Sequence, residues 1–253
     1  MRKANKIFKE ITTQGFSKIK LFSRNDIDNV FKKKIVDQLN QRKIIEKKFT
    51  NKNIRMYHEI IDSEDMHKKI IKPKNRQFKI DENIIKKIKK NKKIKNLIIN
   101  SWDQKKYEIK MFSKNNIKNN FAGFRLARPF KNFKNDVGGE HIDLNFNNKI
   151  YKNQKMLFTI WVPIIGFNKN HTIRVAPLSH IRKHDVKYIK KQKKYISKVY
   201  KSSYIKNFKF KRFNMNKGDV IIFHPNLLHG ASKNLGIFTR VSLDFRIFNP
   251  TLI

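Results

Sequence analysis

The sequence contains no cysteine among its 253 residues. This absence excludes disulfide bonds, zinc sites built on cysteine and thiol nucleophiles, so any metal ion must be held by His, Asp and Glu side chains. Long hydrophobic runs are lacking too: the longest apolar-rich stretch, residues 156–167, is too short for a transmembrane helix. The basic N-terminal segment has no apolar core of the kind found in secretory signals. We therefore expect a cytoplasmic protein that does not enter a membrane.

Acidic residues are scarce, because the chain has 19 Asp and Glu against 60 Lys and Arg, a net charge of +41. An excess of this size suggests nucleic-acid binding. Only 12 of the basic residues are arginine, and the lysines are spread along the whole chain instead of forming a tail. Lysine is accompanied by many Asn, Ile and Phe residues that share its A/T-only codons, so a coding bias explains the charge better than a binding face. Binding of an anionic partner is the second interpretation of the positive charge.

The composition changes near residue 105, from lysine-rich helical patterns to strand-like runs. Apolar residues recur at helical spacing in 24–48 and in 82–99, each stretch preceded by a residue that can cap a helix. A further surface helix is predicted at 187–200. The lysine-rich faces of these helices are expected to be solvated.

Short apolar runs in the second half, some of them separated by turn residues, predict strands. They lie at 156–164, 172–177, 208–214, 219–224 and 239–248. Strands of this kind are typical of an antiparallel sandwich or barrel, with the helices of the first half packed outside. We expect one mainly β domain over 1–253, mostly helical in 1–105 and with its β core in 106–253.

The last predicted strand alternates apolar and polar residues, which places Arg240, Ser242, Asp244 and Arg246 on one face. This face is either solvated or the lining of a ligand cavity. A guanidinium and a hydroxyl on one strand face, here Arg240 and Ser242, make a good clamp for a carboxylate, because the guanidinium donates two parallel charge-assisted hydrogen bonds.

Three residues are candidate metal ligands. His141 and Asp143 are two positions apart, so both can reach one metal ion from a strand. His229 follows a later apolar strand and would be the third ligand; His224, shortly before it, is the rival. Two imidazoles and one carboxylate form the facial triad typical of non-heme Fe(II) oxygenases, which leaves three coordination positions open.

These motifs, in this order and spacing, resemble the Fe(II)/2-oxoglutarate-dependent oxygenases of the phytanoyl-CoA dioxygenase-like superfamily. The resemblance extends to the segment 15–19, to the strand 159–164 around Trp161, and to the turn 176–180. It departs from the family at Leu178, where a glycine is usual before Ser-His. Neither this departure nor the high charge touches a candidate ligand.

The resemblance implies a double-stranded β-helix, that is, a jelly-roll or cupin-like core with flanking helices. It further implies Fe(II) bound by the three candidate ligands, and 2-oxoglutarate held at its far carboxylate by Arg240 and Ser242. Trp161 would line the cofactor pocket, and O2 would be the oxidant of a hydroxylation. Because Asp143 is present, the resemblance does not point to a halogenase.

The substrate is expected to be a small molecule such as a carbohydrate or nucleotide-linked sugar, because the match is closest to a branch associated with carbohydrate-biosynthesis clusters. Arg125 and Arg128, upstream of the metal motif, would meet an anionic substrate or the C1 carboxylate of 2-oxoglutarate; ordinary salt bridges are the alternative.

Two other functions stay open. One is a metal-binding cupin that acts as a sugar epimerase or isomerase without oxygen. The other is a basic nucleic-acid-binding β-barrel without catalysis, which would need Lys and Arg clustered with aromatic residues on one face.

Overall fold

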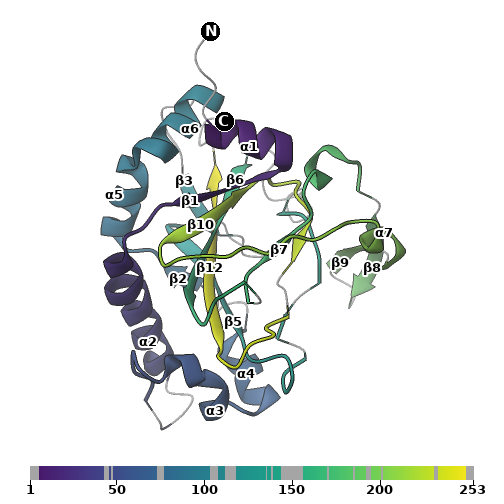
Figure 1. Ribbon diagram of the computed structural model, residues 1–253. Coiled ribbons are helices and arrows are strands. Elements are labelled where there is room, and N and C mark those ends of the chain that lie inside the picture. The colour runs from purple at the N-terminus through teal and green to yellow at the C-terminus, as the bar shows by residue number, and fades with distance from the viewer. Residues whose placement is uncertain are drawn as a thin grey trace.

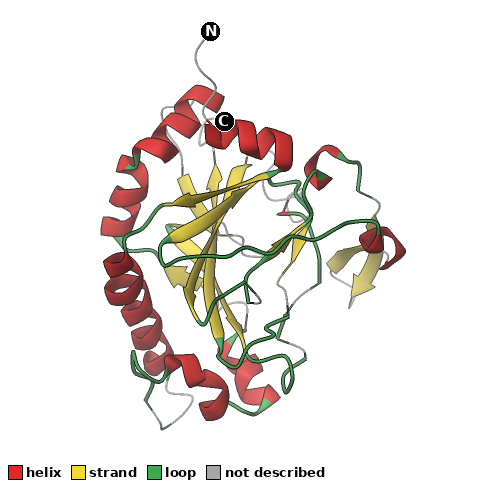
Figure 2. Cartoon of the chain, viewed as in Figure 1, coloured by secondary structure: helices red, strands yellow, loops and turns green. Residues whose placement is uncertain are grey.

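The chain folds around one large antiparallel sheet with helices along one face (Figures 1 and 2). The computed structural model describes residues 6–42, 46, 48–72, 77–102, 108–111, 118–134, 136–137, 139–143, 156–169, 171–184, 186–191, 195–200, 202–230 and 233–248. In these ranges the α-helices are α1 (Lys6–Gln14), α2 (Lys32–Gln41), α3 (Tyr57–Ile60), α4 (Glu64–Ile70), α5 (Glu82–Lys90), α6 (Lys92–Trp102) and α7 (Ser202–Lys206), and shorter helical segments are η1 (Asp26–Phe31), η2 (Ile54–Met56) and η5 (Ser179–Ile181). No helix in the described part is long and apolar enough to cross a membrane.

The strands form one large sheet and two small ones. They are β1 (Phe16–Lys20), β2 (Gln77–Lys79), β3 (Glu108–Met111), β4 (Lys118–Asn119), β5 (Phe121–Ala127), β6 (Met156–Ile165), β7 (Arg174–Val175), β8 (Val186–Lys191), β9 (Tyr195–Tyr200), β10 (Asp219–Phe223), β11 (His229–Gly230) and β12 (Arg240–Phe248). The large sheet has the order β1-β10-β6-β12-β3-β4, with β5 paired to β12 and β2. Strand β12 therefore runs through its middle.

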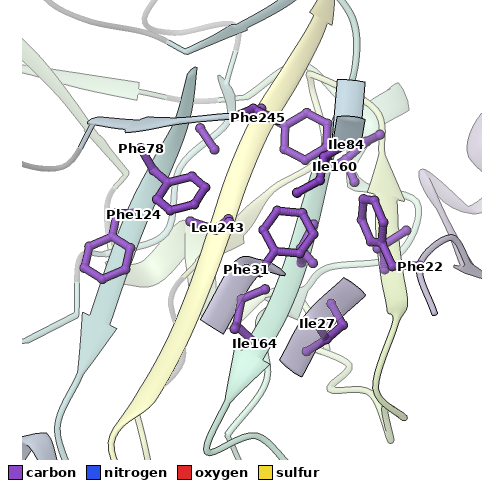
Figure 3. Close-up of a cluster of buried hydrophobic side chains, with 14 of the residues drawn as sticks. Phe22, Ile27, Phe31, Phe78, Ile84, Phe124, Ile160, Ile164, Leu243 and Phe245 are labelled. Atoms are coloured by element: carbon purple, nitrogen blue, oxygen red, sulfur yellow. The ribbon is translucent and has the colours of Figure 1, made fainter. Parts of the chain in front are cut away.

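The two faces of the large sheet have different neighbours. Every residue of β12 is buried, so its polar face is not solvated. The apolar face, with Leu243 and Phe245, packs against the helices in the main core, where Ile27 and Phe31 of η1 meet Ile160 of β6 (Figure 3). The polar face of β12 lines the interior, which settles the choice that the sequence left open.

A second, small layer covers the interior face. Strands β7 and β11 pair with each other, and isolated bridges extend this layer to His141 beyond β11 and to Lys211 beyond β7. An apolar cluster that includes Trp161 of β6, Phe223 of β10 and Val175 of β7 fills part of the space between the two sheets. The functional residues described below lie in this interior.

The helices of the first half follow the expected patterns with two differences. The helix expected over 24–48 runs without interruption from 24 to Gln41, with the π-helical segment η1 followed directly by α2, and residue 48 is no longer helical. In place of one helix over 82–99, α5 ends at Lys90. It is followed by Asn91, whose backbone is extended and whose side chain accepts hydrogen bonds from the N–H groups of Lys93 and Ile94 at the start of α6. A side-chain acceptor at this position caps the second helix.

Two predictions for the second half were wrong. In place of a surface helix over 187–200, the described residues form the paired antiparallel strands β8 and β9, because their β-branched and aromatic residues favour a strand more than the lysines favour a helix. The segment 208–214 is not a strand: only Lys211 pairs, with Val175. The predicted strands at 156–164, 219–224 and 239–248 are confirmed, and 172–177 is reduced to β7.

Candidate metal centre

Two of the predicted ligands are cross-strand partners. The backbone N–H of His141 donates to the carbonyl of His229 at 2.8 Å, and the N–H of His229 donates back at 3.0 Å. This pairing places the two imidazoles side by side, with ring centroids 4.4 Å apart. The small sheet therefore joins residues that are far apart in the sequence into one site.

The orientation of both rings is fixed by the main chain. The Nδ1 of His141 lies 3.0 Å from the carbonyl oxygen of Gly139, and the Nδ1 of His229 lies 2.8 Å from that of Leu227. A carbonyl only accepts, so each Nδ1 carries the proton and each Nε2 keeps its lone pair. This arrangement is the usual one for imidazoles that bind a metal through Nε2.

Asp143 completes the group. One carboxylate oxygen of Asp143 and one ring nitrogen from each of His141 and His229 lie within 4.8 Å of one another; in the part of the chain that the structure describes, this is the one such group that could hold a metal ion. Asp143 is fully buried, and its Oδ1 is 3.9 Å from the Nε2 of His229. The structure thus brings the three predicted ligands together.

The protonation states suit metal binding. Burial lowers the pKa of His141 to about 4, and the neighbouring His229 adds to this effect. Burial also lowers the pKa of His229. For Asp143, burial would raise the pKa, but Arg246 and the two imidazoles outweigh it and hold the pKa below its ordinary value. The three side chains are therefore two neutral imidazoles and a carboxylate at neutral pH, the forms that bind a cation.

Two residues that the sequence did not single out hold this carboxylate. Arg246 donates from Nη2 to Oδ1 of Asp143 at 2.9 Å, and the hydroxyl of Thr159 donates to Oδ2. The alternation of polar and apolar residues in β12 already indicated that Arg246 lies on its polar face. No feature of the sequence indicated that this face contacts Asp143.

Arg240 and Ser242 lie on the same interior face of β12. Both are buried, and Arg240 donates from Nη1 to the carbonyl of His171 at 3.0 Å. Burial, with Arg212 and Arg125 nearby, lowers the pKa of Arg240 to about 10, so it stays a cation at neutral pH. The hydroxyl of Ser242 is buried and has no hydrogen-bond partner among the described residues. An interior cation beside an unsatisfied hydroxyl fits a bound carboxylate.

The two candidate substrate arginines have different surroundings. Arg125 lies opposite Ser242 in the sheet and donates from Nε to Asp244 at 3.1 Å, while 41% of its side chain stays exposed. Arg128 is buried; its guanidinium is bound twice by Asp136, by Glu64 and by backbone carbonyls. The structure therefore places Arg128 in an ion-pair network, which was the alternative interpretation, and leaves Arg125 beside the candidate metal site.

The remaining predicted residues border the site or lie apart from it. Trp161 is buried in the interior cluster and pairs with Asp244 across the sheet, so it forms the wall of the site. His224 does not join the triad: its ring is 5.3 Å from that of His180, and burial lowers its pKa to about 4. His229 is thus the histidine that geometry favours.

The comparisons with known proteins agree with this geometry. The family described as phytanoyl-CoA dioxygenase (PhyH) matches residues 27–242. No curated protein matches the chain.

Three solved structures are similar in fold. The non-heme alpha-ketoglutarate-dependent carbocyclase SnoK from nogalamycin biosynthesis has a TM-score of 0.53 at 10% identity, with 98% of this chain and 85% of that chain covered. The epimerase SnoN, in complex with Fe3+, alpha ketoglutarate and nogalamycin RO, has a TM-score of 0.53 at 11% identity, with 97% and 83% covered. AviO1 from Streptomyces viridochromogenes Tue57 has a TM-score of 0.51 at 10% identity, with 98% and 95% covered.

At these identities the likeness to solved structures concerns the fold alone. The family match is the stronger evidence, because it spans most of the chain and includes the three clustered candidate ligands. The chain therefore belongs to the phytanoyl-CoA dioxygenase family of Fe(II)/2-oxoglutarate-dependent oxygenases.

Proposed function

We propose that the protein is an Fe(II)- and 2-oxoglutarate-dependent dioxygenase that hydroxylates a small molecule. The observation that carries the proposal is that the clustered candidate ligands His141, Asp143 and His229 face the polar side of β12, which reaches Asp143 through Arg246 and also carries the buried Arg240 and Ser242. A metal triad alone is compatible with several activities. An interior guanidinium with an unsatisfied hydroxyl beside it is what a second, carboxylate-bearing ligand requires.

The donor set fits both groups. The two Nε2 atoms and the Asp143 carboxylate would hold Fe(II), and Arg240 with Ser242 would hold the far carboxylate of 2-oxoglutarate. When bound, these groups supply the oxidative chemistry with O2. The chain contributes binding, orientation and the exclusion of water, for which the apolar wall around Trp161 is suited.

The fold and its setting are part of the proposal. We infer that the large sheet and the small layer of β7 and β11 form a double-stranded β-helix within one domain, and that the protein works in the cytoplasm. The helical first half would then support the sheet from outside, as its contacts in the main core indicate.

The substrate is inferred to be small and anionic, such as a nucleotide-linked sugar. Arg125 supports this inference, because one edge of its guanidinium is bound by Asp244 while much of the side chain faces solvent beside the site. Arg128 no longer contributes to it, because its donors are already engaged. The spread of lysines along the chain gives no support to the alternative of a nucleic-acid-binding barrel.

The second candidate function is an oxidation, with the same cofactors, whose product is not hydroxylated. Two proteins of similar fold are described as an epimerase and a carbocyclase that use alpha ketoglutarate. Epimerisation and ring closure differ from hydroxylation in what happens to the oxidised substrate. They would use the same cofactors as the hydroxylation. A cupin that isomerises a sugar without oxygen would need neither Arg240 nor Ser242 in the interior.

The test is release of succinate from 2-oxoglutarate with Fe(II) and O2, measured against sugars, nucleotide sugars, acyl thioesters and small acids. Iron-dependent succinate formation that a substrate stimulates supports the proposal, and mass spectrometry of the product separates hydroxylation from epimerisation or ring closure. Turnover of a sugar without 2-oxoglutarate would establish the isomerase alternative instead.

A further inference from the structure

The carboxylate of Asp143 is held from two sides by one cross-strand pair. Arg246 on β12 lies directly opposite Thr159 on β6 in the sheet register. Arg246 donates to Oδ1 at 2.9 Å and Thr159 donates to Oδ2, so each carboxylate oxygen accepts one hydrogen bond from this pair. Both donors and the carboxylate are buried. A single rung of the sheet therefore determines how Asp143 is oriented.

Arg246 is itself fixed by a second carboxylate. Its Nη1 donates to Oδ2 of Asp244 at 2.8 Å, and the Nε of Arg125 donates to Oδ1 of Asp244 at 3.1 Å. The charges alternate along this row, from Arg125 to Asp244, Arg246 and Asp143. The guanidinium of Arg246 thus donates one hydrogen bond to each of the two carboxylates, from a different amino group in each case, and has little freedom to rotate.

The two oxygens of Asp143 are not equivalent in this arrangement. Oδ1 lies on the side of the imidazoles, 3.9 Å from the Nε2 of His229, while the hydroxyl of Thr159 occupies Oδ2. A carboxylate oxygen has two lone pairs, so Oδ1 keeps one for a cation after it has accepted from Arg246.

We propose that Thr159 and Arg246 are positioning residues, which present Asp143 to the metal through Oδ1 alone and keep Oδ2 out of its coordination. This inference rests on the proposed function, because it needs a metal at the triad. Its consequence is that Asp143 takes one coordination position, which leaves three for the co-substrate and O2 once both imidazoles are bound. Groups that orient a metal ligand by hydrogen bonding commonly change metal affinity by about 10- to 100-fold when they are replaced.

A merely structural role is the alternative. On that view the pair neutralises a buried carboxylate and stabilises the sheet, and the metal does not depend on its geometry. The two views differ in what happens to the metal in protein that is still folded.

The experiment uses Co(II) as a spectroscopic probe in Thr159→Val and Arg246→Lys. Both substitutions keep the charge of the site, so a change in affinity reports on orientation. Thr172→Val is the matched control, because Thr172 is also buried and its hydroxyl donates to a backbone carbonyl, that of Phe213. Circular dichroism establishes that each variant is folded before the titration.

We expect Co(II) affinity to fall about tenfold or more in Thr159→Val and in Arg246→Lys, with a changed visible absorption spectrum, while Thr172→Val matches the wild type. Affinity and spectrum unchanged in both variants would overturn the inference and leave the proposed function standing. An equal loss in Thr172→Val would also overturn it. If Arg246→Lys does not fold, the isosteric Thr159→Val decides alone. Wild-type protein that binds neither Co(II) nor Fe(II) would instead refute the proposed function itself.

Discussion

His141 and His229 are held together by their own backbones, through reciprocal hydrogen bonds of 2.8 and 3.0 Å. The link between the two segments does not depend on the imidazole side chains. Removing one ring should therefore leave the small sheet intact and delete only a nitrogen that is proposed to bind the metal. This separation between scaffold and ligand makes the triad testable by substitution.

We predict that His141→Ala or His229→Ala abolishes iron-dependent turnover and metal binding with little change in the melting temperature. The reason is that each removes one of the three ligand atoms that lie within 4.8 Å of one another. Isothermal titration with Fe(II) under anaerobic conditions, followed by a succinate-release assay, measures both effects.

His224→Ala is the matched control, because His224 lies close to the triad in the sequence but packs against His180. It should bind metal as the wild type does. Loss of iron binding in His224→Ala together with retained binding in His229→Ala would show that His224, and not His229, is the third ligand.

A second prediction concerns Arg240. Replacing it with glutamine removes a charged partner of the inferred 2-oxoglutarate carboxylate, which costs on the order of 2–5 kcal/mol. That energy corresponds to a loss of roughly 30- to 4000-fold in co-substrate affinity. Arg240→Lys should recover only part of it, since an ammonium group cannot reproduce the planar fork. Titration of 2-oxoglutarate in the presence of Fe(II) measures the change.

The control for Arg240 needs an arginine away from the site. Arg246 is unsuitable, because it contacts Asp143. Arg182 is exposed and directly follows the short helix η5, so Arg182→Gln should leave the titration unchanged. A titration of Arg240→Gln that superimposes on the wild type would remove the main reason for preferring an oxygenase to an isomerase.

The cluster of His141, Asp143 and His229 could be predicted from the sequence because the proposed chemistry restricts residue type and local spacing. Asp143 two positions after His141, and Arg240 two positions before Ser242, need only the alternation of a strand. The polar face of β12 followed from the same alternation. That face is buried only because a second layer covers it, which no local pattern reveals.

The positioning residues could not be predicted, because they depend on register between distant strands. Thr159 meets Arg246 through the alignment of β6 with β12, and that alignment includes an irregularity between Val241 and Ser242. Arg125 and Arg128 could not be told apart in the sequence for a related reason. Arg128 differs from Arg125 because it is buried and paired with Asp136, and only the fold provides this burial and this partner.

A third prediction follows from that difference. Arg128→Gln leaves the buried carboxylate of Asp136 without its bidentate partner, and breaking such a pair costs about 3–5 kcal/mol. Arg125→Gln, at a partly exposed side chain, should change the free energy of unfolding by about 1 kcal/mol or less. Urea denaturation measures both. An unfolding free energy of Arg128→Gln within 1 kcal/mol of the wild type, together with a raised KM for the substrate, would return Arg128 to the substrate site.

The final prediction concerns Leu178, which stands where the family usually has glycine and has a left-handed backbone with φ of +65°. This conformation costs a non-glycine residue about 1–2 kcal/mol, and the larger entropy of glycine in the unfolded chain returns about 0.5–1 kcal/mol of that. Half of the Leu178 side chain is exposed, so its removal loses little burial. Leu178→Gly should therefore raise the melting temperature by about 1–4 °C in differential scanning calorimetry. Leu235→Gly, at another exposed leucine whose φ is not positive, should lower it, and a fall in both variants would show that residue 178 is not strained.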